Sequence, residues 1–338
     1  MPKTSLVRFL PVLVIVAILT LAPVFIRNPY IVGVLIRIGI GVIVCLGLQT
    51  LMTTSLVSVA QAAFVGVGAY TSVLFFVRLG WNYWLCLLLA GITAAVFAAI
   101  IGIAVLRAKG IYFFIVTLAF GFVFNVVVAR WISLTGGTRG FTKIPPPNPI
   151  PLGFTTIEFG YANAAQLYYV ILVVCLFSIY VLYRFNRSRI GTTLRSIGEA
   201  DVIAEHVGIN LFAYKELAFI VCCFMAGIAG SLQAEYLLFI SSGSFPVSDS
   251  IYAIIYAVVG GYGSLVGAII GPFVVIWIGE GLTFLPAVKP EYFPFFYGVI
   301  LLLVISFLPG GLVSAQAAIG HQVRKAIGLW RGNRKHLC

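Results

Sequence analysis

The residues that could do chemistry in this chain form no catalytic or metal-binding pattern. The sequence contains neither a G-x-x-x-x-G-K-[ST] phosphate loop nor an H-E-x-x-H zinc motif. Its six cysteines lack metal-ligand or redox spacing and mostly lie in apolar runs, as small hydrophobic residues do. His206, His321 and His336 have no obvious nucleophile beside them. We therefore expect no catalytic residue, no metal site and no cofactor bound by this chain.

Ionisable side chains inside apolar segments are more informative. Arg37, Glu235 and Glu280 fall within or near the ends of runs long enough to cross a bilayer. Because a charge at the bilayer centre costs roughly 2.5–3.5 kcal/mol, such residues are functional candidates. Glu280 is the one carboxylate suited to binding an ion at mid-membrane, and we expect it to lack a carboxylate neighbour. Either glutamate could instead pair with Arg37 or reach the membrane surface.

The stretch 184–215 is highly charged and lies between two apolar runs. Because it cannot face lipid, we expect a water-exposed loop that contains one short helix. Glu199 and Asp201 would favour the positive N-terminal end of that helix, Gly208 would stop it, and Asn210 could cap the next helix. The stretch holds eight of the thirty charged residues: Arg184, Arg187, Arg189, Arg195, Glu199, Asp201, Glu205 and Lys215.

Apolar residues in this loop are spaced to form one face of the short helix. Ile203 and Val207 lie four residues apart, beside Val202. A loop in water has little of its own protein against which to bury such a face. We therefore expect it to dock into a groove on a soluble partner.

Composition sets the class of protein. The chain has 338 residues, of which 62% are hydrophobic and 9% charged, against about 25% charged in soluble domains. Continuous apolar runs exclude a membrane β-barrel. We predict an all-α polytopic membrane protein whose single transmembrane domain covers residues 1–338. About ten spans are expected, near 9–26, 30–48, 60–77, 81–106, 111–132, 166–183, 217–240, 250–263 (short), 265–285 and 293–308.

Lys and Arg predict the orientation of these spans. With the N-terminus in the cytoplasm, fourteen basic residues lie inside and six outside, which agrees with the positive-inside rule. The same rule explains the net charge of +12 without nucleic acid. The loop 134–163 is then external, whereas the loop 184–215, the basic tail 314–338 and both termini are cytoplasmic. The six outside are Arg27, Arg78, Arg130, Arg139, Lys143 and Lys289.

Two glycine-interrupted stretches, 62–70 and 259–264, echo each other. Paired broken segments of this kind are typical of an inverted repeat around a transport pathway. Close helix packing is the other interpretation, because Ala62 with Gly66 and Gly267 with Gly271 are small-xxx-small pairs. The two interpretations are compatible.

Four stretches in order resemble the LivM-type permease subunits of branched-chain amino-acid ABC importers. Residues 188–210 are similar to the family's coupling loop, and residues 58–70 to the segment before its third span. Thr135-Gly136-Gly137 with Gly140 resembles the external loop, and Phe307-Leu308-Pro309 with Gly311-Leu312 resembles the end. The likeness covers roughly 49–312. It implies a type II ABC importer-like permease with an internal inverted repeat in a bacterial inner membrane.

The resemblance also implies a substrate and partners. The substrate would be a branched-chain or other hydrophobic amino acid, or a related small amide or carboxylate. The partners would be a second, LivH-like permease subunit, two cytoplasmic ABC ATPases that use ATP and Mg, an external substrate-binding protein and membrane lipid, with no nucleic acid. Whether the permease pair is homo- or heterodimeric stays open.

Two sets of site residues follow from the resemblance and from the charges at membrane depth. The ATPase-coupling set is Gly191, Leu194, Arg195, Glu199, Ile203, Ala204, Glu205, Val207, Gly208 and Ile209. The substrate-pathway set is Gln61, Phe64, Tyr70, Gly136, Gly137, Arg139, Glu235 and Glu280.

The chain departs from the family pattern at three places. Ala60-Gln61 stands where the family usually has Gly-His, Arg139 where it has Asn or Asp, and Gly198 where it often has Arg. The first two leave the substrate open among branched-chain amino acids, urea, short amides and aromatic acids. Two other functions also stay open: an ion-coupled secondary transporter of small organic solutes, and a scaffold protein without transport.

Overall fold

The computed structural model describes residues 23, 28–108, 110–151, 156–157, 164–283, 292–307 and 311–312. Within these residues eight helices are long and apolar enough to cross a membrane, which confirms the all-α polytopic class. Apart from Pro23, the expected first span 9–26 lies outside the described residues, as does the tail 314–338.

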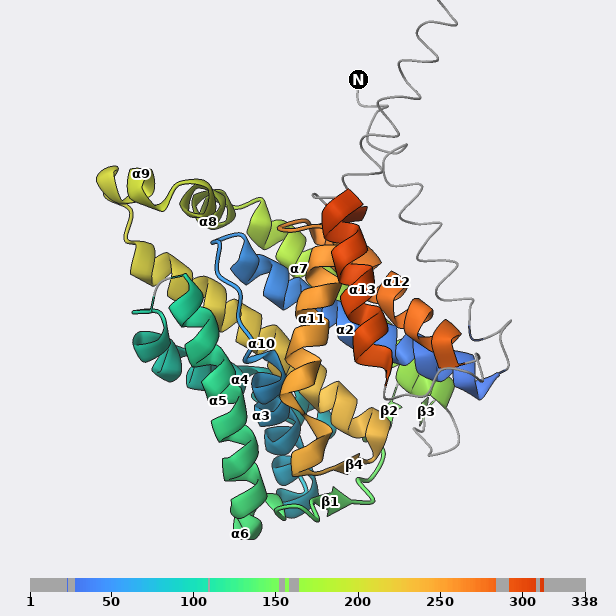
Figure 1. Cartoon of the computed structure of the whole chain (residues 1–338). Coiled ribbons are helices and arrows are strands. Elements are labelled where there is room, and N and C mark those ends of the chain that lie inside the picture. The colour runs from blue at the N-terminus through green and yellow to red at the C-terminus, as the bar shows by residue number, and fades with distance from the viewer. Residues whose placement is uncertain are drawn as a thin grey trace, which may run out of the picture.

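The helices follow one another along the chain with few strands between them (Figure 1). They are α2 (Pro29–Met52), α3 (Gln61–Val73) with a π-helical turn (Leu74–Arg78), α4 (Tyr83–Val105), α5 (Ile111–Arg130), α6 (Ile132–Thr135), α7 (Ala164–Asn186), α8 (Arg189–Glu199), α9 (Asp201–His206), α10 (Leu211–Leu237), α11 (Val247–Gly260), α12 (Leu265–Thr283) and α13 (Phe293–Phe307). The strands are β1 (Phe141–Thr142), β2 (Ile150–Pro151), β3 (Thr156–Ile157) and β4 (Phe239–Ile240).

Asparagine caps set where three long helices begin. The side chains of Asn28, Asn82 and Asn210 each accept a hydrogen bond from a backbone N–H in the first turn of α2, α4 and α10. Such a bond satisfies one of the N–H groups that has no partner within the helix. The predicted cap at Asn210 is therefore confirmed.

Two expected boundaries differ from the structure. The short eighth segment begins earlier than residue 250, because α11 starts at Val247 and follows a 3-10 turn over Ser242–Ser244. Together they form a 19-residue candidate span. Residues 49–52 lie beyond the expected end of the second span at residue 48 but belong to α2, where Gln49 is buried.

Small residues bring the central helices close together. α10 packs against α2, α3 and α4 (Figure 1). A Cβ added to Gly68 of α3 would overlap the carbonyl oxygen of Gly227 in α10, and one added to Gly260 of α11 would overlap that of Gly267 in α12. Between membrane helices such small residues permit backbone approach and van der Waals packing. Gly267 and Gly271 both face the α11 backbone in this way, which confirms the packing interpretation for that pair. A Cβ at Gly66 would instead meet the Phe124 ring, and the inverted repeat stays a prediction.

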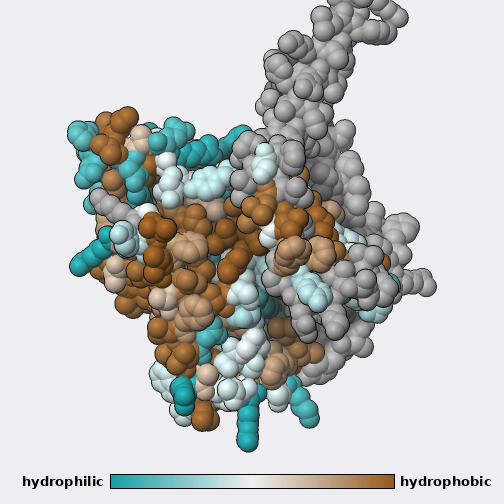
Figure 2. Space-filling view, in the orientation of Figure 1, coloured by the Kyte–Doolittle hydropathy of each residue, from teal (hydrophilic) through white to brown (hydrophobic). Residues whose placement is uncertain are grey.

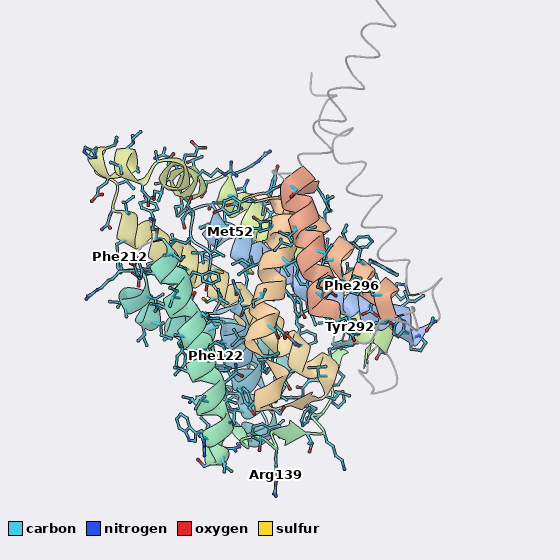
Figure 3. The ribbon with its side chains drawn as sticks, in the orientation of Figure 1. Met52, Phe122, Arg139, Phe212, Tyr292 and Phe296 are labelled. Atoms are coloured by element: carbon cyan, nitrogen blue, oxygen red, sulfur yellow. The ribbon has the colours of Figure 1, made fainter. Side chains whose placement is uncertain are left out.

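The flank formed by α4 and α5 exposes an apolar surface. Leu85, Leu88, Ile92 and Val96 of α4 are each at least half exposed, as is Phe122 of α5, which Figure 3 labels. In Figure 2 brown surface covers the middle of the molecule at the left, and teal gathers toward its upper and lower ends. This distribution is typical of a belt that faces lipid.

The two predicted loops lie at opposite ends of the bundle. α8 and α9 occupy one end, and α6, β1 and β4 occupy the other (Figure 1). At the second end Phe141 pairs with Ile240 across β1 and β4. Arg78 donates a hydrogen bond to the carbonyl oxygen of Ser133 at 2.9 Å and lies over the Phe141 ring. The loop after α5 is thereby attached to the ends of α3 and α10.

Candidate functional site

The loop 184–215 contains two helices, where the sequence predicted one. The hydroxyl of Ser188 caps α8 by accepting a hydrogen bond from the N–H of Gly191 at 3.3 Å. Leu194 and Ile197 are fully buried on one face of α8, which packs against α7 and α10. Glu199 was expected near the start of the short helix. It instead ends α8, because the Ser188 cap and the apolar face extend that helix to residue 199.

α9 is the short helix that the sequence predicted, and it follows α8 after a single residue. Asp201 begins it, and the Lys215 ammonium nitrogen lies 2.6 Å from the Asp201 Oδ2 atom. Ala204 is buried on the inner side of the helix. α9 therefore has contacts on one face, whereas its other face is available to a partner.

A Schellman motif ends α9. The N–H of Gly208 donates to the carbonyl oxygen of Glu205 at 2.9 Å, and the N–H of Ile209 donates to that of Ala204 at 3.1 Å. Gly208 has a φ of +86°, the left-handed conformation that glycine adopts without steric cost. The predicted stop at Gly208 is confirmed.

Three β-branched residues on and just after α9 project into solvent. Val202 and Ile203 are each 67% exposed, and Val207 is 76% exposed. We call these three residues the docking face. Figure 2 shows brown atoms among teal ones at the upper left, where Figure 1 places α9. Of the predicted coupling residues, Gly191, Leu194 and Ala204 are buried, Ile209 is half-buried, and Arg195, Glu199, Ile203, Glu205, Val207 and Gly208 are exposed.

The end of α8 touches the end of α2. A Cβ at Gly198 would overlap the carbonyl oxygen of Thr53, which follows α2 directly. The hydroxyl of Ser55 donates to the carbonyl oxygen of Gly198 at 2.8 Å. Since glycine permits this approach, the structure gives a physical reason for Gly198 in this chain.

Gln49, one turn before the end of α2, ties that helix to the turn between α11 and α12. Its Nε2 atom donates to the carbonyl oxygens of Ala257 and Gly261, each at 2.9 Å. Its Oε1 atom accepts a hydrogen bond from the N–H of Gly263 at 2.6 Å. A continuous set of contacts therefore runs from α8 through α2 to α11 and α12. Sequence reasoning missed Gln49, whose partners lie more than 200 residues away.

A cavity of about 360 Å³ lies between α2, α3, α10, α11, α12 and α13. From α2 it is lined by Arg37, Ile40, Gly41 and Val44, which share one helical face. Its polar lining comes from Arg37, Gln61, Gln233, Tyr236, Asp249, Tyr252, Tyr256, Glu280 and Tyr297. It brings together residues from six helices that are distant in sequence.

An ion pair lines this cavity. The Arg37 Nη2 atom lies 2.6 Å from the Glu280 Oε1 atom, and the Tyr30 hydroxyl donates a hydrogen bond to Glu280 Oε2. The Glu280 side chain is 10% exposed and that of Arg37 is 45% exposed. The pairing predicted as one possibility is thus confirmed for Glu280. It offsets part of the cost of placing two charges at membrane depth.

Asp249, which the sequence analysis missed, lines the same cavity. It lies in the first turn of α11, where the helix dipole favours an anion. Within the described part of the chain its side chain has no hydrogen-bond or ion-pair partner. Asp249 and Glu280 therefore line the same cavity, while the expectation that Glu280 lacks a direct carboxylate neighbour stays a prediction. The sequence feature that could have identified Asp249 is its position as an acidic residue directly before the expected span 250–263.

Gln61 lines the cavity and also carries an unsatisfied polar atom. The residue is 1% exposed, and its Nε2 atom donates to the sulfur of Cys222 at 2.7 Å. Its Oε1 atom is buried without a hydrogen-bond partner among the described residues. A buried acceptor of this kind costs free energy unless a ligand or water supplies a donor.

Three other predicted pathway residues lie away from the cavity. Phe64 is packed in the core, its ring 5.6 Å from that of Phe219. Tyr70 is buried with its ring 6.2 Å from that of Phe245. Glu235 of α10 is 3% exposed and does not line the cavity. Of the predicted substrate-pathway set, the structure therefore brings Gln61 and Glu280 together at this cavity, with Arg37 beside them.

The external-loop candidates shape a turn at the far end of the bundle. Gly136, Gly137 and Gly140 all have positive φ, between +60° and +74°. A Cβ at Gly140 would overlap the carbonyl oxygen of Ile240 in β4. Arg139 is exposed and points away from the helices (Figure 3). It does not line the cavity.

Comparison with known proteins gives a consistent result. The family model described as "Branched-chain amino acid transport system / permease component" matches residues 30–305. The high-affinity branched-chain amino acid transport system permease protein LivM of Salmonella typhimurium is 29% identical over 82% of this chain and 67% of its own length. The ribose import permease protein RbsC of Escherichia coli is 23% identical over 90% of this chain and 92% of its own length. The branched-chain amino acid permease protein LivH of Salmonella typhimurium is 27% identical over 56% of this chain and 60% of its own length.

No solved structure matches the chain. The family match covers all eight candidate spans, including both the loop 184–215 and the cavity. It favours an importer subunit over an ion-coupled carrier or a scaffold. The chain belongs to the permease-component family of branched-chain amino acid transport systems and is a transmembrane permease subunit of an ABC importer.

Proposed function

We propose that this subunit moves branched-chain or other hydrophobic amino acids, or related small amides and carboxylates, across the inner membrane. The branched-chain amino acid transport named for LivM, together with the family match over most of the chain, supports this substrate class. Its partners would be a LivH-like second permease, two cytoplasmic ABC ATPases and an external binding protein, with lipid around α4 and α5. ATP and Mg would act in the ATPases, and this chain would bind neither.

The exposed docking face on α9 is the observation that carries the coupling role. Val202, Ile203 and Val207 are exposed although they are β-branched and apolar. Burying each in a groove of an ATPase is worth roughly 1.5–3 kcal/mol at most. α8 fixes the position of α9, because Leu194 and Ile197 anchor it in the bundle. An anchored helix with an exposed apolar face suits docking into an ATPase whose movement is transmitted to the membrane helices.

Movement of α9 has a route into the membrane. α8 contacts the end of α2 at Gly198, and Gln49 ties α2 to the turn after α11. Since α2, α11 and α12 also line the cavity, closure of the ATPases would change the cavity walls. Nucleotide would then bias two arrangements of the same helices, which is the requirement for alternating access.

The docking face is tested by Ile203→Asp. The variant should keep wild-type expression and detergent melting temperature but lose ATPase association and amino-acid uptake, because a charge cannot enter an apolar groove without cost. Ile203→Leu is the matched control and should keep both. The measurements are pull-down of the ATPase and uptake in cells. Wild-type association and uptake in Ile203→Asp would show that this loop does not couple the ATPases.

The orientation is tested separately. The 14-to-6 distribution of basic residues supports a cytoplasmic location for the loop 184–215. Single cysteines at Lys3, Arg195 and Lys335 should resist impermeant thiol reagents in intact cells and react after permeabilisation. A cysteine at Arg139 should react without permeabilisation. Labelling at Arg195 from outside would reverse the orientation and remove the cytoplasmic ATPases as partners of α9.

A further inference from the structure

We propose that the cavity recognises the transported molecule as a zwitterion. The ligand would be an α-amino acid with an apolar side chain, its ammonium group paired with Asp249 and its carboxylate with Arg37. This inference rests on the proposed transport of amino acids. It adds the place inside the membrane where such a molecule is bound, and the charged side chains that bind it.

The size and walls of the cavity fit one small, partly apolar molecule. Its volume of about 360 Å³ lies at the low end of the roughly 300–1,000 Å³ typical of small-molecule sites. Ile40, Val44, Val65 and Ile276 supply apolar wall. A few polar groups among such walls are what fixes the orientation of a ligand. The lining therefore combines apolar and polar side chains, which suits a small molecule that is apolar in one part and charged in another.

Asp249 supplies the site for a cation. It is a carboxylate in a membrane-depth cavity with no ion-pair partner in the described part of the chain. Asp249 is partly buried, so leaving its carboxylate without a partner has a cost, and an ammonium group would remove part of that cost. Gln233 also lines the cavity and is partly exposed, so its side-chain amide oxygen offers a second acceptor. A ligand ammonium has three N–H donors for these acceptors.

Arg37 supplies the site for an anion while Glu280 holds it in place. A guanidinium carries five N–H donors, and the contact with Glu280 uses the Nη2 atom. The Arg37 side chain is 45% exposed, so its remaining donors are available to a carboxylate. Arg–carboxylate pairs are often bidentate, which adds geometric selectivity. Glu280 is then a positioning residue for Arg37, and Tyr30 in turn holds Glu280.

The test is a thermal-shift titration of the permease complex with its ATPases in nanodiscs, without the binding protein. The probes are L-leucine, L-leucinamide, which lacks the carboxylate, and 4-methylpentanoate, which lacks the amine. Leucine should stabilise the wild-type complex at lower concentration than either analogue. Asp249→Asn and Arg37→Gln should each raise the leucine concentration required by about tenfold or more, since one charged hydrogen-bonded contact is lost.

Two further variants separate loss of binding from loss of folding. Glu216→Gln changes an acid of α10 that does not line the cavity and should leave the leucine titration unchanged. Asp249→Glu keeps the charge and should retain a leucine-dependent shift. Selectivity should also move: Asp249→Asn should reduce the preference for leucine over 4-methylpentanoate, and Arg37→Gln the preference over leucinamide.

The outcomes distinguish this inference from the proposed function. Wild-type leucine titrations in both Asp249→Asn and Arg37→Gln, with ATP-driven leucine uptake intact, would overturn the cavity assignment and leave the importer function standing. Equal stabilisation of the wild type by leucine and both analogues would also overturn it. Absence of ATPase association and of ATP-driven uptake in the wild type would instead contradict the proposed function.

Discussion

The α9 docking face and the intramembrane cavity are opposite in composition. The docking face presents Val202, Ile203 and Val207 to water on a basic end of the molecule, whereas charged Arg37 and Asp249 line a cavity among apolar helices. Each leaves an interaction unmade in the isolated chain. Exposed apolar area costs about 25 cal/mol per Å², and a partly buried carboxylate without a partner is costly as well. The difference indicates an apolar protein groove as one partner and a charged small molecule as the other.

The largest expected effect separates the two faces of the same loop. Leu194 is fully buried in the core, whereas Val207 is 76% exposed. Leu194→Asp should destabilise the protein by about 4 kcal/mol or more, because it removes core packing and buries a charge. Val207→Asp should leave detergent melting unchanged and lose ATPase binding. Melting temperature and ATPase pull-down of both variants give the comparison; similar melting losses in the two would show that α9 is packed rather than exposed.

The second prediction concerns a variant that should weaken the connection between the docking face and the cavity. Gln49→Ala removes three hydrogen bonds between α2 and the α11–α12 turn, each worth about 0.6 kcal/mol in a membrane protein, or about 2 kcal/mol together. We expect ATP hydrolysis by the complex to persist with less leucine imported per ATP. Thr50→Ala, which removes only a bond within α2, is the control. An unchanged transport-to-hydrolysis ratio in Gln49→Ala would mean that coupling takes another route.

A smaller effect is expected where α9 ends. Gly208 has a φ of +86° and open space around its Cβ position, so Gly208→Val is opposed by backbone strain alone, about 1–2 kcal/mol. The Schellman bonds should weaken, with reduced ATPase association and little change in melting temperature. Gly208→Asn tolerates the left-handed conformation and should bind nearly as wild type. Equal binding by both variants would exclude this turn as a determinant of docking.

The smallest effect on stability concerns the far end of the molecule. Arg139 is exposed and contacts neither the docking face nor the cavity, so Arg139→Asn should change stability by less than about 0.5 kcal/mol. We expect a change in substrate affinity or preference instead, since Arg139 departs from the family pattern in a water-exposed loop. Uptake kinetics with several amino acids measure it, and Lys143→Asn is the matched control. Unchanged kinetics would identify Arg139 as a surface charge.

Most of the loop could be predicted because its determinants are local. The Gly208 stop, the Asn210 cap and the four-residue spacing of Ile203 and Val207 each involve neighbours within a few residues. α8 was missed although Ser188 is a good cap residue. The apolar runs likewise predicted the membrane helices, because continuous hydrophobicity over that length has few other structural solutions.

The sequence by itself therefore determined the membrane class, most spans, the charge asymmetry and the short helix with its exposed face. Only the tertiary structure decided that Asp249, Gln61 and the Arg37–Glu280 pair line one cavity, and that Phe64 and Glu235 do not. The reason is physical: helix propensity, capping and hydropathy act over a few residues, whereas the cavity depends on how helices more than 200 residues apart pack. Small residues such as Gly68 and Gly227 set that packing by allowing backbones to touch.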